Sequence, residues 1–245
     1  MLDCCIIIPC YNEYDRILKN DFINFLEDNK DFHFVFVDDG SVDDTFLMLQ
    51  DLSVKNDRIS CFRLDNNHGK AEAVRFGVNK LINDNFSFFG FIDADLAIPL
   101  DELSRLHMEL TSRDNIGFVY ASKNTKLNTH LEMKVKRFWV GRILSFMVRR
   151  SLKVDIYDTQ CGCKIMTKDI AKISFKEKFI SSWLFDIEIF WKIIKNFGRD
   201  YIRENTLEIP LEKLYNRGES KVSLAALIKL PLEFIKIHRY YSRKT

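Results

Sequence analysis

The sequence lacks the features that mark several classes of protein. It has no stretch near the roughly 18 uninterrupted apolar residues that a membrane-spanning helix requires. No secretory leader is visible, because a strand-like run begins at Cys4 and the acidic residues Glu13 and Asp15 follow closely. The six cysteines form no paired CxxC units, so we expect no zinc module and reduced, mostly buried thiols. A net charge of only +2 does not suggest nucleic acid as a partner.

Internal repeats and low-complexity linkers are also absent, which favours one large folded unit. The 245 residues are 47% apolar and 29% charged, an ordinary composition for a globular protein. The 21 phenylalanines imply either a thick aromatic core or an apolar exposed surface. We expect an α/β domain over residues 1–223 and an amphipathic helix over residues 224–245, interrupted by Pro231.

Short apolar runs alternate with segments whose apolar residues recur at helical spacing. The predicted strands are residues 4–10, 32–37, 59–64, 86–92, 118–123 and, as an edge strand, 207–210. Alternation at this interval predicts a mostly parallel, doubly wound sheet. In such sheets ligands bind beyond the carboxyl ends of the strands.

The most informative segment is Asp93-Ala94-Asp95, which ends the apolar run 86–92. Ionised carboxylates are seldom buried without a partner, so this is a poor core sequence. It suits Mg²⁺ or Mn²⁺, which take one or two carboxylates and complete their coordination with phosphate oxygens. The alternative is a solvated turn.

Polar residues also follow two other predicted strands, at positions 11–13 and 38–39. Because the carboxyl ends of parallel strands meet at one edge of a sheet, we expect these residues to lie near Asp93 and Asp95. This convergence indicates a binding site. The alternative is that acidic turns only solubilise that edge.

Four ordered motifs resemble those of family-2 glycosyltransferases with the GT-A fold. They are Pro9-x-Tyr11-Asn12-Glu13, Val37-Asp38-Asp39-Gly40-Ser41-x-Asp43-x-Thr45, Asn67-x-Gly69-Lys70 and Asp93-Ala94-Asp95. Within that family the chain is similar to the polyprenyl-phosphate sugar synthases. The resemblance implies a Rossmann-like, mostly parallel sheet flanked by helices, with residues 1–223 as the catalytic domain and amphipathic helices near the C-terminus.

The resemblance also assigns the donor side of the site. The implied donor-binding residues are Pro9, Tyr11, Glu13, Val37, Asp39, Lys70, Asp93 and Ala94. Asp93 and Asp95 would hold the Mg²⁺ or Mn²⁺ ion that bridges the diphosphate of the donor. Two departures from the family pattern stand out: Ala97 replaces a Gln found in mannosyl synthases, and Ala71 replaces a second Gly after Gly69-Lys70.

On the sugar and acceptor side the resemblance implies Lys123, Asp158, Gln160, Asp186, Glu188, Arg217 and Lys221. Residues 158–164 are similar to the Asp-Thr-Gln-Cys-Gly-x-Lys segment of glucosyl-type members, which favours UDP-glucose over GDP-mannose. Asp95 and Asp158 are the implied catalytic residues. An acceptor that is already a phosphate anion needs little base, so Asp158 would position acceptor or sugar.

Plainer alternatives exist for several of these residues. Lys123 replaces a family Arg and loses the bidentate fork, so it could be an ordinary surface lysine. Asp158 could cap a turn. Asp186 and Glu188, expected to face sugar hydroxyls, could be acidic residues at a helix N-terminus. Arg217 and Lys221 are expected to meet diphosphate or lipid phosphate.

Residues 134–154 form a basic amphipathic segment, with seven Lys or Arg between 134 and 153 and no acidic residue there. Such a helix either lies at a membrane surface or packs its apolar face against the core with its charged face toward solvent. The family resemblance favours the membrane, where a polyprenyl acceptor would be met. We expect membrane contact at the cytoplasmic face to be peripheral, or to involve an anchoring partner or a homo-oligomer.

Taken together, the residues and the family resemblance favour a metal-dependent glycosyltransferase that moves a hexose, most of all glucose from UDP-glucose, to a polyprenyl phosphate. The resemblance implies that the transfer is inverting. One alternative keeps the fold with a saccharide acceptor in surface-glycan assembly, which would require a true general base. Another is a nucleotide-binding module without transfer activity.

Overall fold

The structure is a computed structural model that describes residues 3–123, 135–215 and 224–243. In the two helices that begin at 135 and 224, side chains are described from residues 144 and 230 onward. The strands are β1 (Cys4–Cys10), β2 (Phe32–Asp38), β3 (Ile59–Arg63), β4 (Phe88–Ile92), β5 (Phe118–Ser122), β6 (Cys163–Thr167) and β7 (Thr206–Pro210). The helices are α1 (Lys19–Asp28), α2 (Thr45–Lys55), α3 (Lys70–Leu81), α4 (Leu100–Thr111), α5 (Val135–Leu152), α6 (Lys168–Phe175), α7 (Phe185–Phe197), α8 (Arg199–Asn205) and α9 (Leu224–Ser242).

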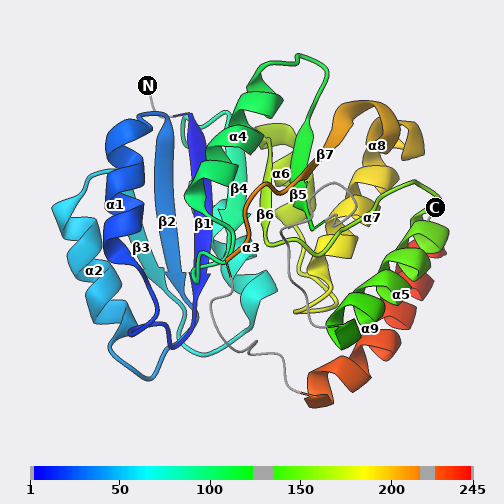
Figure 1. The fold of residues 1–245 in the computed structure, drawn as a ribbon, viewed down its shortest axis with the longest axis horizontal. Coiled ribbons are helices and arrows are strands. Elements are labelled where there is room, and N and C mark those ends of the chain that lie inside the picture. The colour runs from blue at the N-terminus through cyan, green and yellow to red at the C-terminus, as the bar shows by residue number, and fades with distance from the viewer. Residues whose placement is uncertain (1–2, 124–134, 216–223, 244–245) are drawn as a thin grey trace.

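In the described part of the chain the strands form one sheet in the order β3-β2-β1-β4-β6-β5-β7 (Figure 1). The strands β3, β2, β1 and β4 run parallel, as predicted, and β7 is an edge strand beside β5. β6 is antiparallel to both β4 and β5. This strand was not predicted, because Lys164 interrupts its five-residue apolar run. The α/β class with a mostly parallel, helix-flanked sheet is confirmed.

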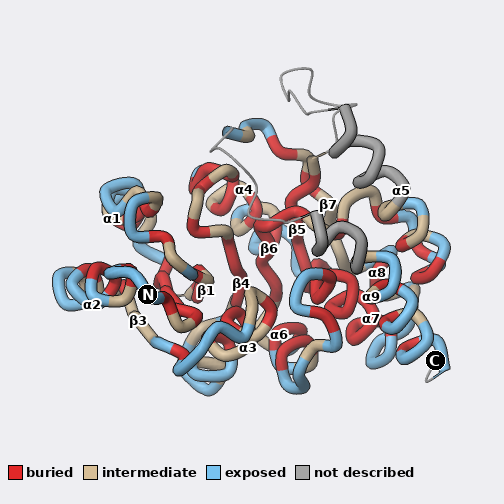
Figure 2. Tube along the Cα trace, turned by 90° about the horizontal axis from the view of Figure 1, so that it is seen from below, coloured by how far each residue is buried: buried red, intermediate tan, exposed pale blue. Residues whose placement is uncertain are grey.

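Alternation along each strand divides the core between the two faces of the sheet. Cys4, Ile6 and Ile8 of β1 pack with residues of α1, α2 and α4. Cys5 and Ile7 pack on the other face with residues of α3, α6 and α7. Burial on both faces explains why these strands read as continuous apolar runs. Figure 2 shows the resulting buried sheet between helices whose outer surfaces are exposed.

Much of the phenylalanine content lies in this core. Phe22 of α1 meets Phe34 and Phe36 of β2 edge-on, with ring centroids 5.4 and 5.1 Å apart. On the other face, Phe118 lies 5.3 Å from Phe190 of α7. The aromatic residues therefore fill the space between sheet and helices, where edge-to-face pairs add to the burial of apolar area.

The helices α5 and α9 lie side by side at one end of the molecule, against α7 (Figure 1). Ile237 and Tyr241 of α9 are buried, and the Tyr241 ring stacks on Trp191 of α7 at 6.0 Å. The Oγ of Ser151 on α5 lies 2.7 Å from Nδ1 of His238. α9 continues through Pro231, so the predicted interruption of the helix at that residue is wrong. None of the helices described is both long enough and apolar enough to span a bilayer.

The close approach of β4 and β6 generates a first prediction. A Cβ atom on Gly90 would collide with the backbone oxygen of Lys164 on β6, which cannot move without breaking the strand pairing. We expect Gly90→Ala to lower the free energy of unfolding in urea by about 3 kcal/mol.

Gly117→Ala is the matched control. Its Cβ would collide with the hydroxyl end of the Tyr201 side chain, which can shift, and would make an ordinary contact with Ile170. A loss below about 1 kcal/mol is expected there, and equal losses in the two variants would contradict the account of the β4–β6 contact.

Candidate active site

The loops that follow β1, β2 and β4 meet at one edge of the sheet. The backbone N–H groups of Asn12 and Glu13 donate to the hydroxyls of Ser41 and Thr45, both at 2.9 Å. The Arg16 guanidinium then joins the first loop to the third, since it lies 3.5 Å from Glu13 and 3.7 Å from Asp95. The predicted convergence therefore exists, and Arg16 is a member that sequence reasoning missed.

Both carboxylate oxygens of Asp93 have a close neighbour at this edge of the sheet. Its Oδ1 lies 2.5 Å from Nζ of Lys70, the first residue of α3. Its Oδ2 lies directly over Gly162, where a Cβ atom would collide with it. Burial opposes the charge on Lys70, but the carboxylates of Asp93 and Asp186 outweigh that penalty and raise the pKa of Lys70. Lys70 therefore remains a cation beside Asp93 at neutral pH.

Asp95 is held more loosely than Asp93. Its Oδ1 accepts the N–H of Ala97 at 3.0 Å, so its second oxygen faces Arg16. Leu96, which directly follows Asp95, has φ of +47°, a left-handed conformation unusual for leucine. This turn keeps both carboxylates at the end of β4 instead of letting the chain continue as a strand.

A second ion pair lies beneath the first. Nζ of Lys164, fully buried, is 2.6 Å from Oδ1 of Asp186, which is also buried at the start of α7. The same ammonium donates to the carbonyl of Cys161 at 2.5 Å. Burial raises the pKa of Asp186, although Lys164 and Lys70 oppose that shift. Asp186 is therefore almost fully buried and paired with Lys164, whereas a residue that only contacts sugar hydroxyls would be expected to have an exposed carboxylate.

The carboxylate of Asp39 shapes the turn that precedes Lys70. Its two oxygens accept the N–H groups of His68 at 2.8 Å and Gly69 at 2.7 Å. Gly69 has φ of +91°, a conformation that favours glycine. Burial raises the pKa of Asp39 even though both N–H donors oppose the shift. Asp39 thus holds the Gly69-Lys70 turn as well as lying at the predicted nucleotide edge.

Asp158 connects two further predicted residues. Its carboxylate accepts the N–H of Lys123 at 3.1 Å and that of Gln160 at 2.8 Å. Its own N–H donates to Glu208 of β7 at 2.9 Å. The side-chain Nε2 of Gln160 is buried and has no hydrogen-bond partner among the described residues. Asp158 therefore positions Lys123 and Gln160, and Glu208 was not anticipated from the sequence.

The side chains of three predicted site residues are buried. Glu188 has no exposed surface, and it accepts hydrogen bonds from the N–H groups of Ile180 and Ser181 and from the Tyr241 hydroxyl. Sugar hydroxyls have no access to it in this arrangement. The side chains of Val37 and Ala94 are buried in the core, on opposite faces of the sheet.

The remaining predicted residues divide into two groups. At the end of β1, Pro9 is half-buried and Tyr11 is 37% exposed, so both leave surface at the edge of the sheet. Arg217 and Lys221 lie outside the described residues, as do the side chains of the first half of the segment 134–154.

The oxygen donors of Asp93 and Asp95 fit a divalent cation. Their side chains are 41% and 32% exposed, so a cation and its other ligands could reach them. In the described part of the chain no third His, Cys, Asp or Glu side chain completes a metal cluster. Mg²⁺ needs only one or two carboxylates when phosphate oxygens and waters supply the rest. In this structure the ammonium of Lys70 supplies the positive charge at Asp93.

Two hollows in the described surface lie away from this edge. One, of about 670 Å³, lies at the amino ends of the strands and is lined by residues that include Asp3, Asp31 and Ser87. The other, of about 440 Å³, lies at the end of α5. We place the candidate active site at Asp93 because charged groups from α3, α7 and the loops after β1 and β4 converge there.

Comparison with known proteins agrees with this placement. Residues 5–174 match the model of glycosyl transferase family 2. The dolichyl-phosphate beta-glucosyltransferase ALG5C of Trichomonas vaginalis is 25% identical over 248 residues, which cover 96% of this chain and 70% of that protein. The dolichyl-phosphate beta-glucosyltransferase of Dictyostelium discoideum is 29% identical over 226 residues, covering 85% and 68%. That of Saccharomyces cerevisiae is 27% identical over 259 residues, covering 96% and 74%.

Solved structures share the fold. Glucosyl-3-phosphoglycerate synthase from Mycobacterium tuberculosis in complex with UDP superposes with a TM-score of 0.68 at 17% identity, over 97% of this chain and 80% of that one. The same enzyme with Mn²⁺, UDP and phosphoglyceric acid gives 0.67 at 15% identity, over 97% and 78%. These likenesses confirm the predicted GT-A fold.

The buried pair of Lys164 and Asp186 generates a second prediction. Asp186→Leu leaves the Lys164 ammonium buried without its counter-charge, and we expect a loss of about 3–5 kcal/mol in the free energy of unfolding. Adding Lys164→Met removes that unpaired charge and should recover most of the loss. Urea unfolding of the two single variants and the double variant measures this, and additive losses would contradict it.

Proposed function

Because this chain belongs to glycosyl transferase family 2, we propose that it transfers glucose from UDP-glucose to a polyprenyl phosphate, with inversion, at a membrane surface. The observation that carries the proposal is the pair of carboxylates at the end of β4, one of them already neutralised by Lys70. The names of the relatives that match 85–96% of the chain support this donor sugar and this acceptor.

The donor would lie along the edge formed by the first three loops. Pro9, Tyr11, Glu13, Val37, Asp39 and Ala94 form the nucleotide side, with Val37 and Ala94 contributing through the backbone because their side chains are buried. The exposed ring of Tyr11 offers a stacking surface for the base. The Asp39 carboxylate, bound to the His68 and Gly69 N–H groups, keeps Lys70 at this edge.

Lys70 would bind the diphosphate of the donor. Its raised pKa keeps it protonated, and its ammonium already lies within 2.5 Å of one anionic oxygen. Asp93 and Asp95 would hold a Mg²⁺ or Mn²⁺ ion. When bound, that ion supplies neutralisation of the charge that develops on the leaving diphosphate. Replacing water by fixed charges of this kind stabilises the transition state without reorganisation.

The acceptor side would be organised by Asp158. A polyprenyl phosphate attacks as an anion, so orientation is required more than proton removal. Asp158 uses its carboxylate oxygens to hold the backbone of Lys123 and Gln160, so that the Lys123 ammonium can face phosphate. Asp186 would act with Lys164 beneath the sugar, and Arg217 and Lys221 remain proposed phosphate contacts.

The membrane contact we propose is peripheral, at the cytoplasmic face. Exposed apolar and basic side chains occur together on the described parts of α5 and α9, among them Phe146, Leu232 and Ile235. All six cysteines are free thiols, which suits a reducing compartment. An anchoring partner or a second copy of the chain would strengthen that contact.

The direct test is transfer of radiolabelled sugar to a short polyprenyl phosphate in detergent with Mn²⁺, from UDP-glucose and, in parallel, GDP-mannose. Butanol-extractable label is expected from UDP-glucose. We expect Asp95→Asn to reduce kcat/KM by at least about a hundredfold, because a fixed charge at the diphosphate is lost.

The control is Asp51→Asn, which changes an exposed carboxylate on α2 and should transfer at the wild-type rate. Label from GDP-mannose alone would overturn the proposed donor. Tight binding of UDP with no lipid label from either donor would favour a saccharide acceptor or a non-catalytic module instead.

Gly162 provides a further prediction. A methyl group there would collide with Asp93 Oδ2, while the backbone itself is not in the left-handed region. We expect Gly162→Ala to weaken UDP binding in the presence of Mn²⁺ by roughly tenfold or more, about 1.4 kcal/mol. Calorimetric titration measures this, and Gly117→Ala, whose Cβ meets Tyr201 instead, should bind as the wild type does. If Gly162→Ala bound UDP with the wild-type affinity, the proposal that Asp93 belongs to the donor site would be wrong.

A further inference from the structure

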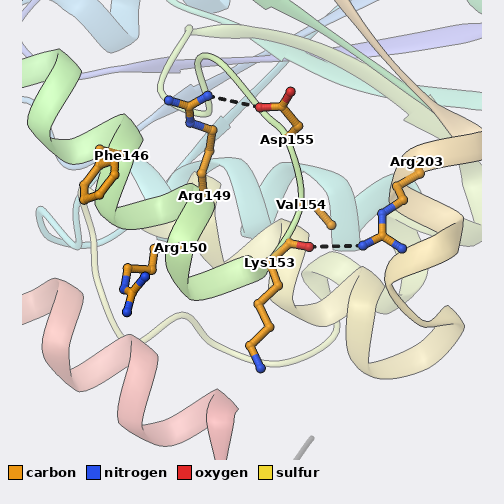
Figure 3. Close-up of a pocket in the computed structure, with 7 residues that line it drawn as sticks. All are labelled: Phe146, Arg149, Arg150, Lys153, Val154, Asp155 and Arg203. Atoms are coloured by element: carbon orange, nitrogen blue, oxygen red, sulfur yellow. Dashed lines mark hydrogen bonds and ion pairs between the residues drawn. The ribbon is translucent and has the colours of Figure 1, made fainter.

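A basic hollow of about 440 Å³ lies where α5 ends, between that helix and α8 (Figure 3). It is lined by Phe146, Arg149, Arg150, Lys153, Val154, Asp155 and Arg203. None of these residues belongs to the candidate active site, and the donor edge uses none of them. The hollow therefore requires a separate explanation.

Its charge balance favours an anion. Asp155 pairs with Arg149 at 3.0 Å, and Asp200 pairs with Arg203 at 2.5 Å. Within the part of the chain that the structure describes, no carboxylate lies within ion-pair distance of Arg150 or Lys153, and both are exposed. Two of the four cations that line the hollow are thus unmatched.

Part of this cluster has an ordinary structural role. Arg199 and Arg203 donate to the carbonyls of Leu152 and Lys153 at 2.9 and 3.3 Å, which satisfies groups at the C-terminus of α5. Among the described residues, the side chains of Arg150 and Lys153 donate no such hydrogen bond. Cations near a helix C-terminus are favourable in general, but capping alone does not explain the two exposed cations that line this hollow.

The fold fixes the backbone positions of the two unmatched cations. Lys153 has φ of +59°, which ends α5 at this point, and its carbonyl is held by Arg203. The opposite side of the helix is anchored, since Val148 and Leu152 are buried in the core. The hollow is therefore formed by the fold and not only by long side chains.

Apolar surface lies beside the charge. Phe146, one turn before Arg150, is 61% exposed and lines the same hollow. On the neighbouring α9, Leu232 is 61% and Ile235 is 41% exposed. Exposed aromatic and aliphatic residues next to unmatched cations are typical of helices that lie in the interface of an anionic membrane.

We propose that this hollow binds the phosphate of an anionic lipid headgroup through Arg150 and Lys153, with Phe146 inserted beside it. The inference rests on the proposed membrane-surface function and specifies its lipid partner. A phosphate group matches the charge of two cations that line one hollow, and the exposed Phe146 beside them favours a lipid over a free phosphate. Binding here would orient the protein without occupying the acceptor site.

The test is sedimentation of the full chain with vesicles of phosphatidylcholine alone and of phosphatidylcholine with about one third phosphatidylglycerol, without nucleotide sugar. The wild type is expected to bind the anionic vesicles preferentially. Arg150→Gln with Lys153→Gln should weaken that binding roughly thirtyfold, near fivefold per cation. The control, Lys19→Gln with Lys30→Gln, removes the same charge from exposed positions at α1, on the far side of the molecule, and should change binding less than twofold (Figure 1).

Equal losses of vesicle binding in both double variants would overturn the proposal, because nonspecific electrostatic attraction between the protein and the anionic surface would then explain the binding. Equal binding to neutral and anionic vesicles would overturn it as well. Titration with inorganic phosphate distinguishes the source: phosphate binding that the hollow variant abolishes, with unchanged vesicle binding, would replace the lipid by a free phosphate. Sugar transfer in detergent is measured separately. If the wild type transfers no sugar, but the double variant at Arg150 and Lys153 still binds anionic vesicles more weakly than the control variant does, the proposed function is contradicted and this inference stands.

Discussion

The position of the Asp93 carboxylate is the constraint on which the candidate active site depends. It lies at the end of a buried strand, against the backbone of Gly162 and within 2.5 Å of the Lys70 ammonium. Each of these two contacts depends on another element of the fold, which places the contacting residue. Gly162 is placed by the antiparallel strand β6, and Lys70 is placed by the turn that Asp39 holds. A charged group at a sheet edge is thereby fixed on both sides without losing its access to solvent.

The parts of this arrangement that follow local rules could be predicted from the sequence. Parallel strands bring their carboxyl ends to one edge, so the polar residues after β1, β2 and β4 had to converge. The spacing of apolar residues located these strands to within about two residues. Ordered motifs then identified the family, because four weak signals in the right order are far more specific than any one of them.

The parts that depend on distant contacts could not be predicted. Glu188 reads as an acidic residue near a helix start, and nothing local indicates that Tyr241, 53 residues later, will donate to it in the core. The strand β6 could not be recognised because it contains Lys164, and a buried lysine is unusual in a strand. The partner that allows this burial, Asp186, is remote in sequence. Arg16 resembles any surface arginine until the fold brings Glu13 and Asp95 to it.

Lys70 and the proposed divalent cation cannot both neutralise the same Asp93 oxygen, so we propose that the cation replaces the Lys70 ammonium at Asp93 when the donor binds and that Lys70 then contacts the diphosphate. A crystal structure with UDP and Mn²⁺, with the anomalous signal of manganese recorded, measures this most directly. We expect a manganese peak within coordination distance of the Asp93 and Asp95 carboxylates, and the Lys70 ammonium moved from Asp93 to the diphosphate. Manganese bound elsewhere, or Lys70 still paired with Asp93 beside a bound nucleotide, would contradict it.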